Sequence, residues 1–293
     1  MPPSSPAQDQ LDRLAAAHDA RLSVWMGSLD GTAWLARDAE TEHPAASTLK
    51  LALVIALHRC AADRSLSLDD EVLVRSHSDS AVPGQAYDTT QDYDQDDAVW
   101  DRLGDSVPLR WLGERAITRS SNLATNLLID RLGTAAVNAV YASAGAKHAK
   151  VERGIQDTPA MAAGLSNTVT AADLAAVFVS LLAGRLIPDA GDVERVLAAN
   201  EWNEAIPAGL PKGTYVAHKT GWFDGVCHDA ALVRPHGEEP FVLVLLSGAG
   251  LDETGMHALV ADAARICWQH RQNRQRGRYD HKNVDPFVRE VDR

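Results

Sequence analysis

The feature that most constrains the fold of this 293-residue chain is that its strand-like segments lie at its two ends. Near the start, residues 21–26 and 32–36 flank the turn Leu-Asp-Gly-Thr at 29–32, which predicts a β-hairpin. After Pro211, β-branched or alternating segments return at residues 214–218, 226–233 and 240–246. Strands from both ends can therefore complete one antiparallel sheet.

The long segment between these strands is helical in pattern. Apolar residues recur at helical spacing in residues 48–64, 108–117, 122–132, 134–144, 170–182 and 191–200. Thr170 followed by Asp173 is similar to a capping box, which marks a helix start. Two further helices are predicted near the ends of the chain, at residues 11–17 and 256–270.

This order predicts an α/β (α+β) fold, in which an antiparallel sheet is flanked by helices and joined to a helical lobe. We expect residues 1–293 to form a single domain in two lobes. The sheet lobe comprises about residues 10–40 and 205–272, the helical lobe about 47–204, and residues 273–293 form a polar tail. A cleft between two such lobes is a common place for a binding site.

Composition and charge exclude several classes of function. The formal net charge is −12, which disfavours nucleic acid and anionic membranes as partners. No stretch reaches the roughly 18 apolar residues of a membrane span. Cys60, Cys227 and Cys267 are far apart, so neither a metal site nor a disulfide framework is indicated.

The N-terminus leaves two interpretations of localisation open. Residues 1–6 read Met-Pro-Pro-Ser-Ser-Pro and lack the charged and apolar regions of a signal sequence. The protein is cytoplasmic if Met1 is the native start, and secreted or periplasmic if a leader was removed.

An aspartate-rich segment interrupts the helical pattern. Residues 76–105 are irregular, with seven aspartates between Asp88 and Asp105. The spacing within residues 92–97 is superficially similar to a calcium loop, but the glycine and distal glutamate of an EF-hand are missing. We predict a solvated loop.

The first chemical motif is Ser47-Thr48-Leu49-Lys50, at the start of a predicted helix. Residues three apart share a helix face, so the Lys50 amine can lie beside the Ser47 hydroxyl. A serine needs a base to become nucleophilic, and a buried lysine near other cations can have its pKa lowered enough to serve. An S-x-x-K match is expected about once by chance in a chain of this length. The alternative is therefore that Ser47 caps the helix and Lys50 extends to solvent.

Two further motifs complete a set. In Ser120-Ser121-Asn122, a second hydroxyl can relay a proton and an amide can orient the lysine, although this triplet also suits a helix N-cap. In Lys219-Thr220-Gly221, the amine would attract a substrate carboxylate and the glycine would let a substrate approach the strand. The alternative for this triplet is a strand that ends in a polar turn.

Together, the three motifs resemble the class A β-lactamase family and its serine-hydrolase relatives. S-x-x-K, S-x-N and K-T-G occur in the family's order, and two of only six lysines fall at the required places. The resemblance covers about residues 11–270 and also includes residues 121–128 and 229–233. It implies a two-lobed fold, attack by Ser47 on a β-lactam carbonyl to give an acyl-enzyme, and no cofactor.

The resemblance also assigns roles and a partner. The residues it implies are Ser47, Lys50 and Ser120 for catalysis; Asn122, Lys219, Thr220 and Gly221 for substrate binding; and the N–H groups of Ser47 and Trp222 for an oxyanion hole. Lys50 would be the base or proton relay and Ser120 the proton donor. The partner would be a small molecule that carries a carboxylate, and no metal is expected.

The sequence departs from the family pattern at two places. Ser121 replaces the aspartate of S-D-N. In the loop at residues 151–157 the family's E-x-x-L-N pattern is missing, and taking Arg153 as the loop arginine puts Ile155 at the position of the deacylating glutamate. Glu152 or Asp157 could substitute, but we favour surface or structural roles for them. Deacylation could use Lys50 instead.

Three hypotheses of function therefore remain open: a hydrolase that turns over β-lactams, a relative that acts on a non-antibiotic ester or amide, and a penicillin-binding module that stays acylated. His218 and His228 flank the third motif. We expect them to pack or hydrogen-bond nearby rather than to touch substrate.

Overall fold

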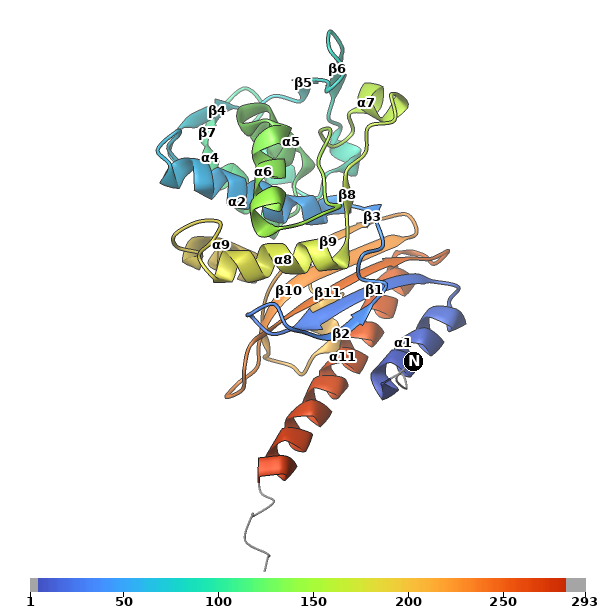
Figure 1. Cartoon of the computed structure of the whole chain (residues 1–293). Helices are drawn as coiled ribbons and strands as arrows, with labels where there is room; N and C mark the ends of the chain where they lie inside the picture. Colours follow the sequence, from blue (N-terminus) through green and yellow to red (C-terminus); the bar gives the residue numbers. More distant parts are fainter. Residues whose placement is uncertain (1–4, 283–293) are drawn as a thin grey trace, which may run out of the picture.

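A five-stranded antiparallel sheet forms the centre of the structure, a computed structural model that describes residues 5–282 and the side chains of residues 5–273. The strands are β1 (Arg21–Gly27), β2 (Ala33–Arg37), β9 (Tyr215–Phe223), β10 (Val226–Arg234) and β11 (Phe241–Gly248). Their order is β2-β1-β11-β10-β9, so the N-terminal hairpin joins the C-terminal strands through the β1–β11 pair (Figure 1). The predicted completion of one sheet from both ends of the chain is confirmed.

The sheet is buried on both faces, because its strands send alternate side chains into two different cores. On β11, the even-numbered residues 242–246 contribute to the core beneath the helical lobe, and the odd-numbered residues 241–245 contribute to the core on the opposite face. Helices α1 (Pro6–Ala17), α10 (Ile206–Gly209) and α11 (Glu253–Lys282) belong to that opposite side (Figure 1).

Both terminal helices are longer than predicted. Helix α1 begins at Pro6, because the Ser5 side chain accepts a hydrogen bond from the backbone N–H of Gln8 and Pro6 suits a first helical turn. Helix α11 runs to Lys282, so the first part of the predicted polar tail, residues 273–282, is helical. Arginine and glutamine favour helix, and no proline stops it there. The rest of the predicted tail lies outside the described residues.

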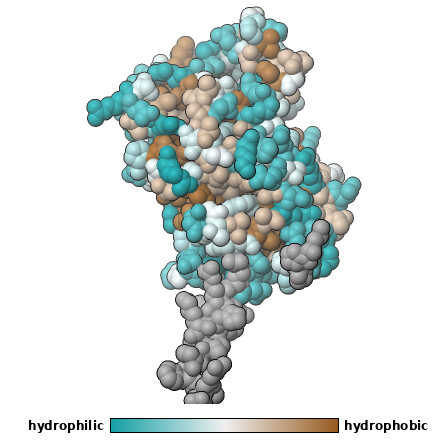
Figure 2. All heavy atoms as spheres, in the orientation of Figure 1, coloured by the Kyte–Doolittle hydropathy of each residue, from teal (hydrophilic) through white to brown (hydrophobic). Residues whose placement is uncertain are grey.

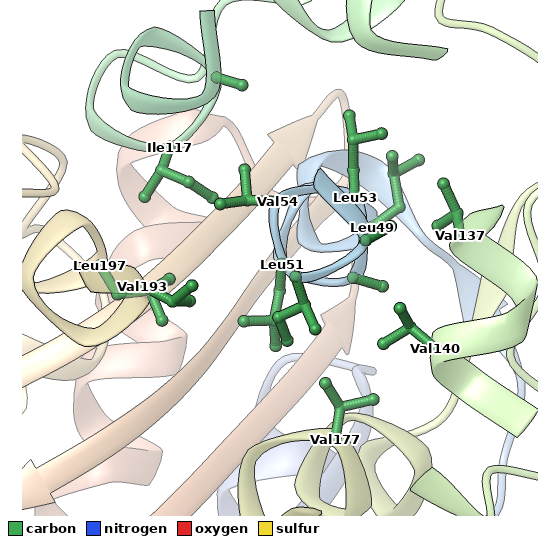
Figure 3. Close-up of a cluster of buried hydrophobic side chains, with 14 of the residues drawn as sticks. Leu49, Leu51, Leu53, Val54, Ile117, Val137, Val140, Val177, Val193 and Leu197 are labelled. Carbon is green, nitrogen blue, oxygen red and sulfur yellow. The ribbon is translucent and has the colours of Figure 1, made fainter. Parts of the chain in front are cut away.

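The helical lobe is built around α2 (Leu49–Ala62). Every residue from Leu49 to Leu57 is buried, and Figure 3 shows side chains from the surrounding helices pointing toward this helix from several sides. The surrounding helices are α4 (Leu109–Thr118), α5 (Asn122–Leu132), α6 (Thr134–Ala144), α8 (Ala171–Leu182) and α9 (Gly191–Ala198). Helix α8 also packs on the sheet, on the face opposite α11 (Figure 1).

Short elements organise the segments between these helices. They are β3 (His43–Pro44) with β8 (Thr168–Val169), β4 (Glu71–Leu73) with β7 (Ser106–Pro108), β5 (His77–Asp79) with β6 (Ala86–Asp88), η1 (Ala46–Thr48), η2 (Gln91–Tyr93), α3 (Asp97–Trp100) and α7 (Thr158–Ala162). The segment predicted to be irregular therefore holds several of them.

The surface agrees with the acidic, polar composition. Figure 2 shows one face on which hydrophilic and intermediate residues surround small, separate hydrophobic patches. Among the helices within residues 5–282, none has both the length and the apolar character that a bilayer crossing requires.

Candidate active site

Side chains from three parts of the chain meet where the helical lobe contacts the sheet. Lys50 lies in the first turn of α2, Ser120 lies between α4 and α5, and Lys219 lies on β9. All three are buried, with 0%, 2% and 0% of their surface exposed. Fully buried lysines are rare unless their amines are paired with other groups, because an isolated ammonium group is costly to remove from water.

Hydrogen bonds link these side chains into one network. The Lys50 Nζ donates to the Ser120 carbonyl oxygen at 2.7 Å, to Asn122 Oδ1 at 2.8 Å and to Ser120 Oγ at 3.3 Å. The Lys219 Nζ donates to Ser120 Oγ at 3.1 Å and to the Thr220 carbonyl oxygen at 2.7 Å. The Ser120 hydroxyl is therefore shared by two amines, as a proton relay requires.

The surroundings lower the pKa of both amines. Burial lowers the pKa of Lys50 from 10.5 to about 7, and the nearby Asp94 carboxylate opposes this change. Burial also places the pKa of Lys219 well below its usual value, and the charge of Lys50 adds to the effect. A neutral Lys50 amine is consequently available near neutral pH, and it can accept a proton.

Ser47 lies in η1, just before α2, and is partly buried. Gly221 on β9 lies against this turn, because a Cβ added to it would lie 2.5 Å from the backbone nitrogen of Ser47. Ala46, directly before Ser47, has a left-handed φ of 45°, an uncommon conformation that is frequent at functional sites. The hydrogen bonds of the Lys50 amine go to Ser120 and Asn122 rather than to Ser47. The predicted proximity of the Ser47 hydroxyl and the Lys50 amine is therefore not accompanied by a hydrogen bond between them.

Thr220 and Trp222 point away from the lysine network. Thr220 pairs with Asp229 on β10, and its buried hydroxyl has no hydrogen-bond partner within the described chain. The Trp222 ring packs edge-on against Trp202 at 5.1 Å between centroids. The predicted contact of Thr220 with a substrate carboxylate, and the predicted oxyanion role of the Trp222 N–H, remain predictions.

His218 and His228 are buried and hydrogen-bonded, in agreement with the packing interpretation. The Nδ1 of His218 lies 3.0 Å from the Asp229 carboxylate. The Nε2 of His228 lies 2.9 Å from the carbonyl oxygen of Pro44.

The sequence analysis missed Asp94. This carboxylate accepts hydrogen bonds from the backbone N–H groups of Asn122 (3.1 Å) and Leu123 (2.7 Å) and from the Ser121 hydroxyl (3.2 Å). Asp96, in the same segment, is 2% exposed and forms an ion pair with Arg115. The prediction of a solvated aspartate loop is therefore wrong at these two residues. The serine at position 121 was the available signal, because it left the start of α5 without the family's carboxylate.

The loop at residues 151–157 has no carboxylate free for catalysis among its candidates. The Glu152 carboxylate forms an ion pair with the Lys150 amine at 3.0 Å, and it also accepts a hydrogen bond from the Ser166 backbone N–H. Asp157 is fully buried and caps α7. Its carboxylate also accepts hydrogen bonds from the Ser80 hydroxyl and the Ala81 backbone N–H. The structural roles favoured for both residues agree with these contacts.

The side chain of Asn126 holds the backbone of Ile155 on both sides. The Ile155 N–H donates to Asn126 Oδ1 at 2.7 Å, and Asn126 Nδ2 donates to the Ile155 carbonyl oxygen at 2.9 Å. Asn126 lies one helical turn after Asn122, the residue that binds Lys50. The backbone of Ile155 is thus held close to the lysine network.

Known proteins share this architecture. An ancestral class A β-lactamase of Gram-negative bacteria superimposes with a TM-score of 0.77 and 26% identity, over 90% of this chain and 99% of the other. A PBP-A variant, in an acyl-enzyme complex with penicillin G, superimposes with a TM-score of 0.75 and 22% identity, over 93% and 100% of the two chains. A β-lactamase of Streptomyces fradiae is 28% identical over 267 residues, which cover 88% of this chain and 84% of the relative.

The five-stranded sheet and helical lobe define the fold shared by class A β-lactamases and penicillin-binding proteins. The chain belongs to the beta-lactamase enzyme family, which it matches over residues 6–271. It is accordingly a serine hydrolase of amide bonds.

Proposed function

We propose that Ser47 is acylated by β-lactams and that the acyl-enzyme is then hydrolysed slowly. The observation that carries this proposal is the convergence of Lys50 and Lys219 on the Ser120 hydroxyl, beside the turn that holds Ser47. The acyl-enzyme that a PBP-A variant forms with penicillin G, in a chain of the same fold, supports the choice of substrate.

Acylation begins when the neutral amine of Lys50 takes the proton of the Ser47 hydroxyl. The serine oxygen then forms a bond to the lactam carbonyl carbon, and the N–H groups of Ser47 and Trp222 would stabilise the negative charge on the carbonyl oxygen. The carbon–nitrogen bond breaks, and the departing nitrogen takes a proton from Ser120. The Lys50 ammonium returns a proton to Ser120, so the lysine ends neutral and the product is an ester at Ser47.

The substrate-binding side of the site is the edge of β9. Gly221 has no side chain, so β9 lies directly against the backbone of Ser47, an approach that any larger side chain would prevent. The Lys219 amine would pair with a substrate carboxylate, whose negative charge would favour the protonated amine. The contact of the Thr220 hydroxyl with the same carboxylate rests on the motif alone. This part of the proposal predicts that β-lactams without a carboxylate react more slowly.

Deacylation requires a water molecule and a base, and the loop near α5 provides no free carboxylate for this. Ile155, whose backbone Asn126 holds, has an apolar side chain that packs partly buried against the core. Glu152 and Asp157 are engaged elsewhere. Lys50 is then the remaining base, and it must serve both half-reactions.

The apolar Ile155 also favours a second candidate, hydrolysis of a non-antibiotic ester or amide with Lys50 as the base for both steps. An ester has a better leaving group than an amide, and its acyl group need not fill the site as a β-lactam does. This candidate predicts fast turnover of simple esters and no stable adduct with penicillin.

The test is intact-mass spectrometry after incubation with benzylpenicillin, together with turnover of a chromogenic cephalosporin and of an aryl ester. The proposal predicts an adduct of one penicillin that decays slowly, and none in Ser47→Ala. Rapid cephalosporin turnover without an adduct would indicate an efficient β-lactamase. Ester turnover with no reaction toward either β-lactam would establish the second candidate.

A further inference from the structure

We propose that Asp94 is a positioning residue of this site: its carboxylate fixes the start of α5 and so holds Ser120 and Asn122 against Lys50. This inference rests on the proposed function, because the effect of positioning is measured as the acylation of Ser47. It assigns a role within the site to an aspartate from a loop remote in sequence.

Asp94 accepts five hydrogen bonds, three from the start of α5 and two from its own segment of the chain. One carboxylate oxygen accepts from the N–H groups of Asn122 (3.1 Å) and Gln95 (2.8 Å). The other accepts from the N–H of Leu123 (2.7 Å), the Ser121 hydroxyl (3.2 Å) and Trp100 Nε1 (3.1 Å). All five partners are donors, so an amide in place of the carboxylate would turn an N–H₂ group toward at least two other donors. Negative charge at the N-terminus of a helix is also favourable.

The residues that Asp94 holds are the residues that bind Lys50. Asn122 is tied to the loop twice, because its backbone donates to Asp94 and its side-chain N–H donates to the Tyr93 carbonyl oxygen. The other side-chain atom of Asn122, its Oδ1, accepts from the Lys50 amine at 2.8 Å. Asp94 and Lys50 are therefore connected through a single intervening residue.

Ser120 needs such support. Its φ of 58° is left-handed, an unfavourable conformation for a residue with a side chain that persists only where the surrounding structure holds it. The next residue, Ser121, caps α5 by accepting from the N–H of Ala124 at 3.1 Å, and its own hydroxyl proton goes to Asp94. Fixing Ser121 in this way restrains the adjacent Ser120, whose carbonyl oxygen and hydroxyl both bind Lys50.

The loop that carries Asp94 is itself anchored. Two residues further on, Asp96 is buried, caps α3 and pairs with Arg115 of α4. The loop is thus fastened to α4 on one side of Asp94 and, through Tyr93, to α5 on the other. This anchoring lets an aspartate 28 residues before Asn122 act as a fixed part of the site.

Asp94 also contributes charge. The groups that face Lys50 are the amine of Lys219 from β9, the carboxylate of Asp94 from the loop, and the neutral side chains of Ser120 and Asn122; Asp229 acts on Lys219 from β10. The Asp94 charge favours the protonated form of Lys50 and so opposes the effect of burial on its pKa. Removing that charge lowers the Lys50 pKa further. The amine would then become neutral at a lower pH.

The test compares Asp94→Asn with Asp92→Asn, which makes the same charge change at an exposed residue of the same loop. Rates of acylation by a fluorescent penicillin are measured from pH 5 to 9, and folding is followed by circular dichroism. We expect Asp94→Asn to acylate about 10- to 100-fold more slowly, the size of effect that small displacements of reacting groups produce. The acid limb of its pH profile should move to lower pH, and Asp92→Asn should match the wild type.

A rescue variant separates positioning from general support of the fold. Ser121→Asp added to Asp94→Asn returns a carboxylate to the same helix start, and it should restore most of the rate and the position of the acid limb. The proposal is overturned if folded Asp94→Asn acylates at the wild-type rate with an unchanged pH profile. It is also overturned if the acylation rate falls while the acid limb of the pH profile stays at the wild-type position. If Asp94→Asn does not fold, the double variant decides the question. An acid limb of its pH profile at the wild-type position supports the proposal, and a displaced acid limb overturns it.

A second probe keeps this inference distinct from the proposed function. An aryl phosphonate monoester phosphonylates an activated serine without any β-lactam chemistry. If the wild type reacts with the phosphonate but not with penicillin, the proposed substrate is wrong. The same comparison of variants, made with the phosphonate, still tests Asp94.

Discussion

The two sides of the candidate active site differ in the catalytic groups that they contain. On the side formed by α2, α5 and β9, two buried amines, a hydroxyl and an amide form one hydrogen-bonded network. On the side formed by residues 151–157, both carboxylates are bound to other groups, and Ile155 presents an apolar side chain. In the proposed reaction, the first side would activate Ser47, whereas the second lacks a free base for the water that would release the acyl group.

If the proposed function holds, this difference means that the two halves of the acyl-transfer reaction depend on separate parts of the structure. In the proposed reaction, acylation depends on residues held by the buried helix α2, the start of α5 and the edge strand β9. Deacylation would depend on the loop at residues 151–157, which belongs to no regular helix or strand, and a loop can change with little cost to the fold. A chain of this family can therefore keep the machinery that forms the ester while its capacity to hydrolyse the ester falls.

The largest expected effect comes from removing the base. Lys50→Met should slow acylation about 10²- to 10⁴-fold, because Ser47 loses its proton acceptor. The variant should still fold, because methionine fills a similar volume and the removal of a buried amine offsets the hydrogen bonds lost at Ser120 and Asn122. Stopped-flow labelling with fluorescent penicillin measures the rate, and Lys147→Met, at an exposed lysine, is the matched control. Acylation that survives in Lys50→Met would remove this lysine from the mechanism.

The pH dependence tests the same side without a mutation. Because only the neutral Lys50 accepts a proton and its pKa is about 7, the acylation rate should fall about tenfold per pH unit below that value and level off above it. A flat profile from pH 5 to 8 would contradict the lowered pKa.

The same shift of the Lys50 pKa has a consequence for stability. The folded-state pKa of about 7 lies below the usual 10.5, so the unfolded chain binds more protons between these values. The free energy of unfolding should therefore rise with pH across this window, and the rise should be smaller in Lys50→Met. Chemical denaturation at pH 7 and pH 9 measures both chains.

A carboxylate placed in the loop would sharpen the comparison. Ile155→Glu should increase the rate of deacylation by about 10-fold or more, since a positioned general base is worth at least that much. Ile155→Gln, which has nearly the same shape and no charge, should not. Equal turnover in the two variants would show that the loop, even with a carboxylate, does not reach the ester.

The smallest effects concern the two carboxylates already in the loop. Asp157→Asn should lower the free energy of unfolding by about 1–3 kcal/mol, because its buried oxygens accept several hydrogen bonds. Glu152→Gln should change it by no more than about 0.5 kcal/mol. Thermal denaturation measures both, and neither variant should slow deacylation. A deacylation rate that falls in either one would identify it as the missing base.

Much of this architecture could be predicted from the sequence, because local patterns determine it. The bounds predicted for residues 122–132 and 134–144 match α5 and α6, since apolar spacing and the Gly133 between them define each helix. Lys50, Ser120 and Lys219 were found because each lies within a short motif whose order along the chain is specific.

Other features depended on contacts that no local pattern contains. The third motif lies inside β9 rather than at its end, because β9 continues to pair with β10 as far as Phe223. Asp94 is one of seven aspartates in its segment, and only the folded chain shows which of them meets the start of α5. The N–H groups of a helix N-terminus can bind any carboxylate that reaches them, so the sequence alone does not identify which loop supplies the carboxylate.

Burst kinetics with a chromogenic cephalosporin test the central claim most directly. If the acylating side is complete and the deacylating side is not, mixing should give a rapid burst of about one product molecule per protein, followed by a much slower steady rate. A linear time course at a high rate, with no burst, would show that ester hydrolysis keeps pace with ester formation, and the proposed difference between the two sides would be wrong.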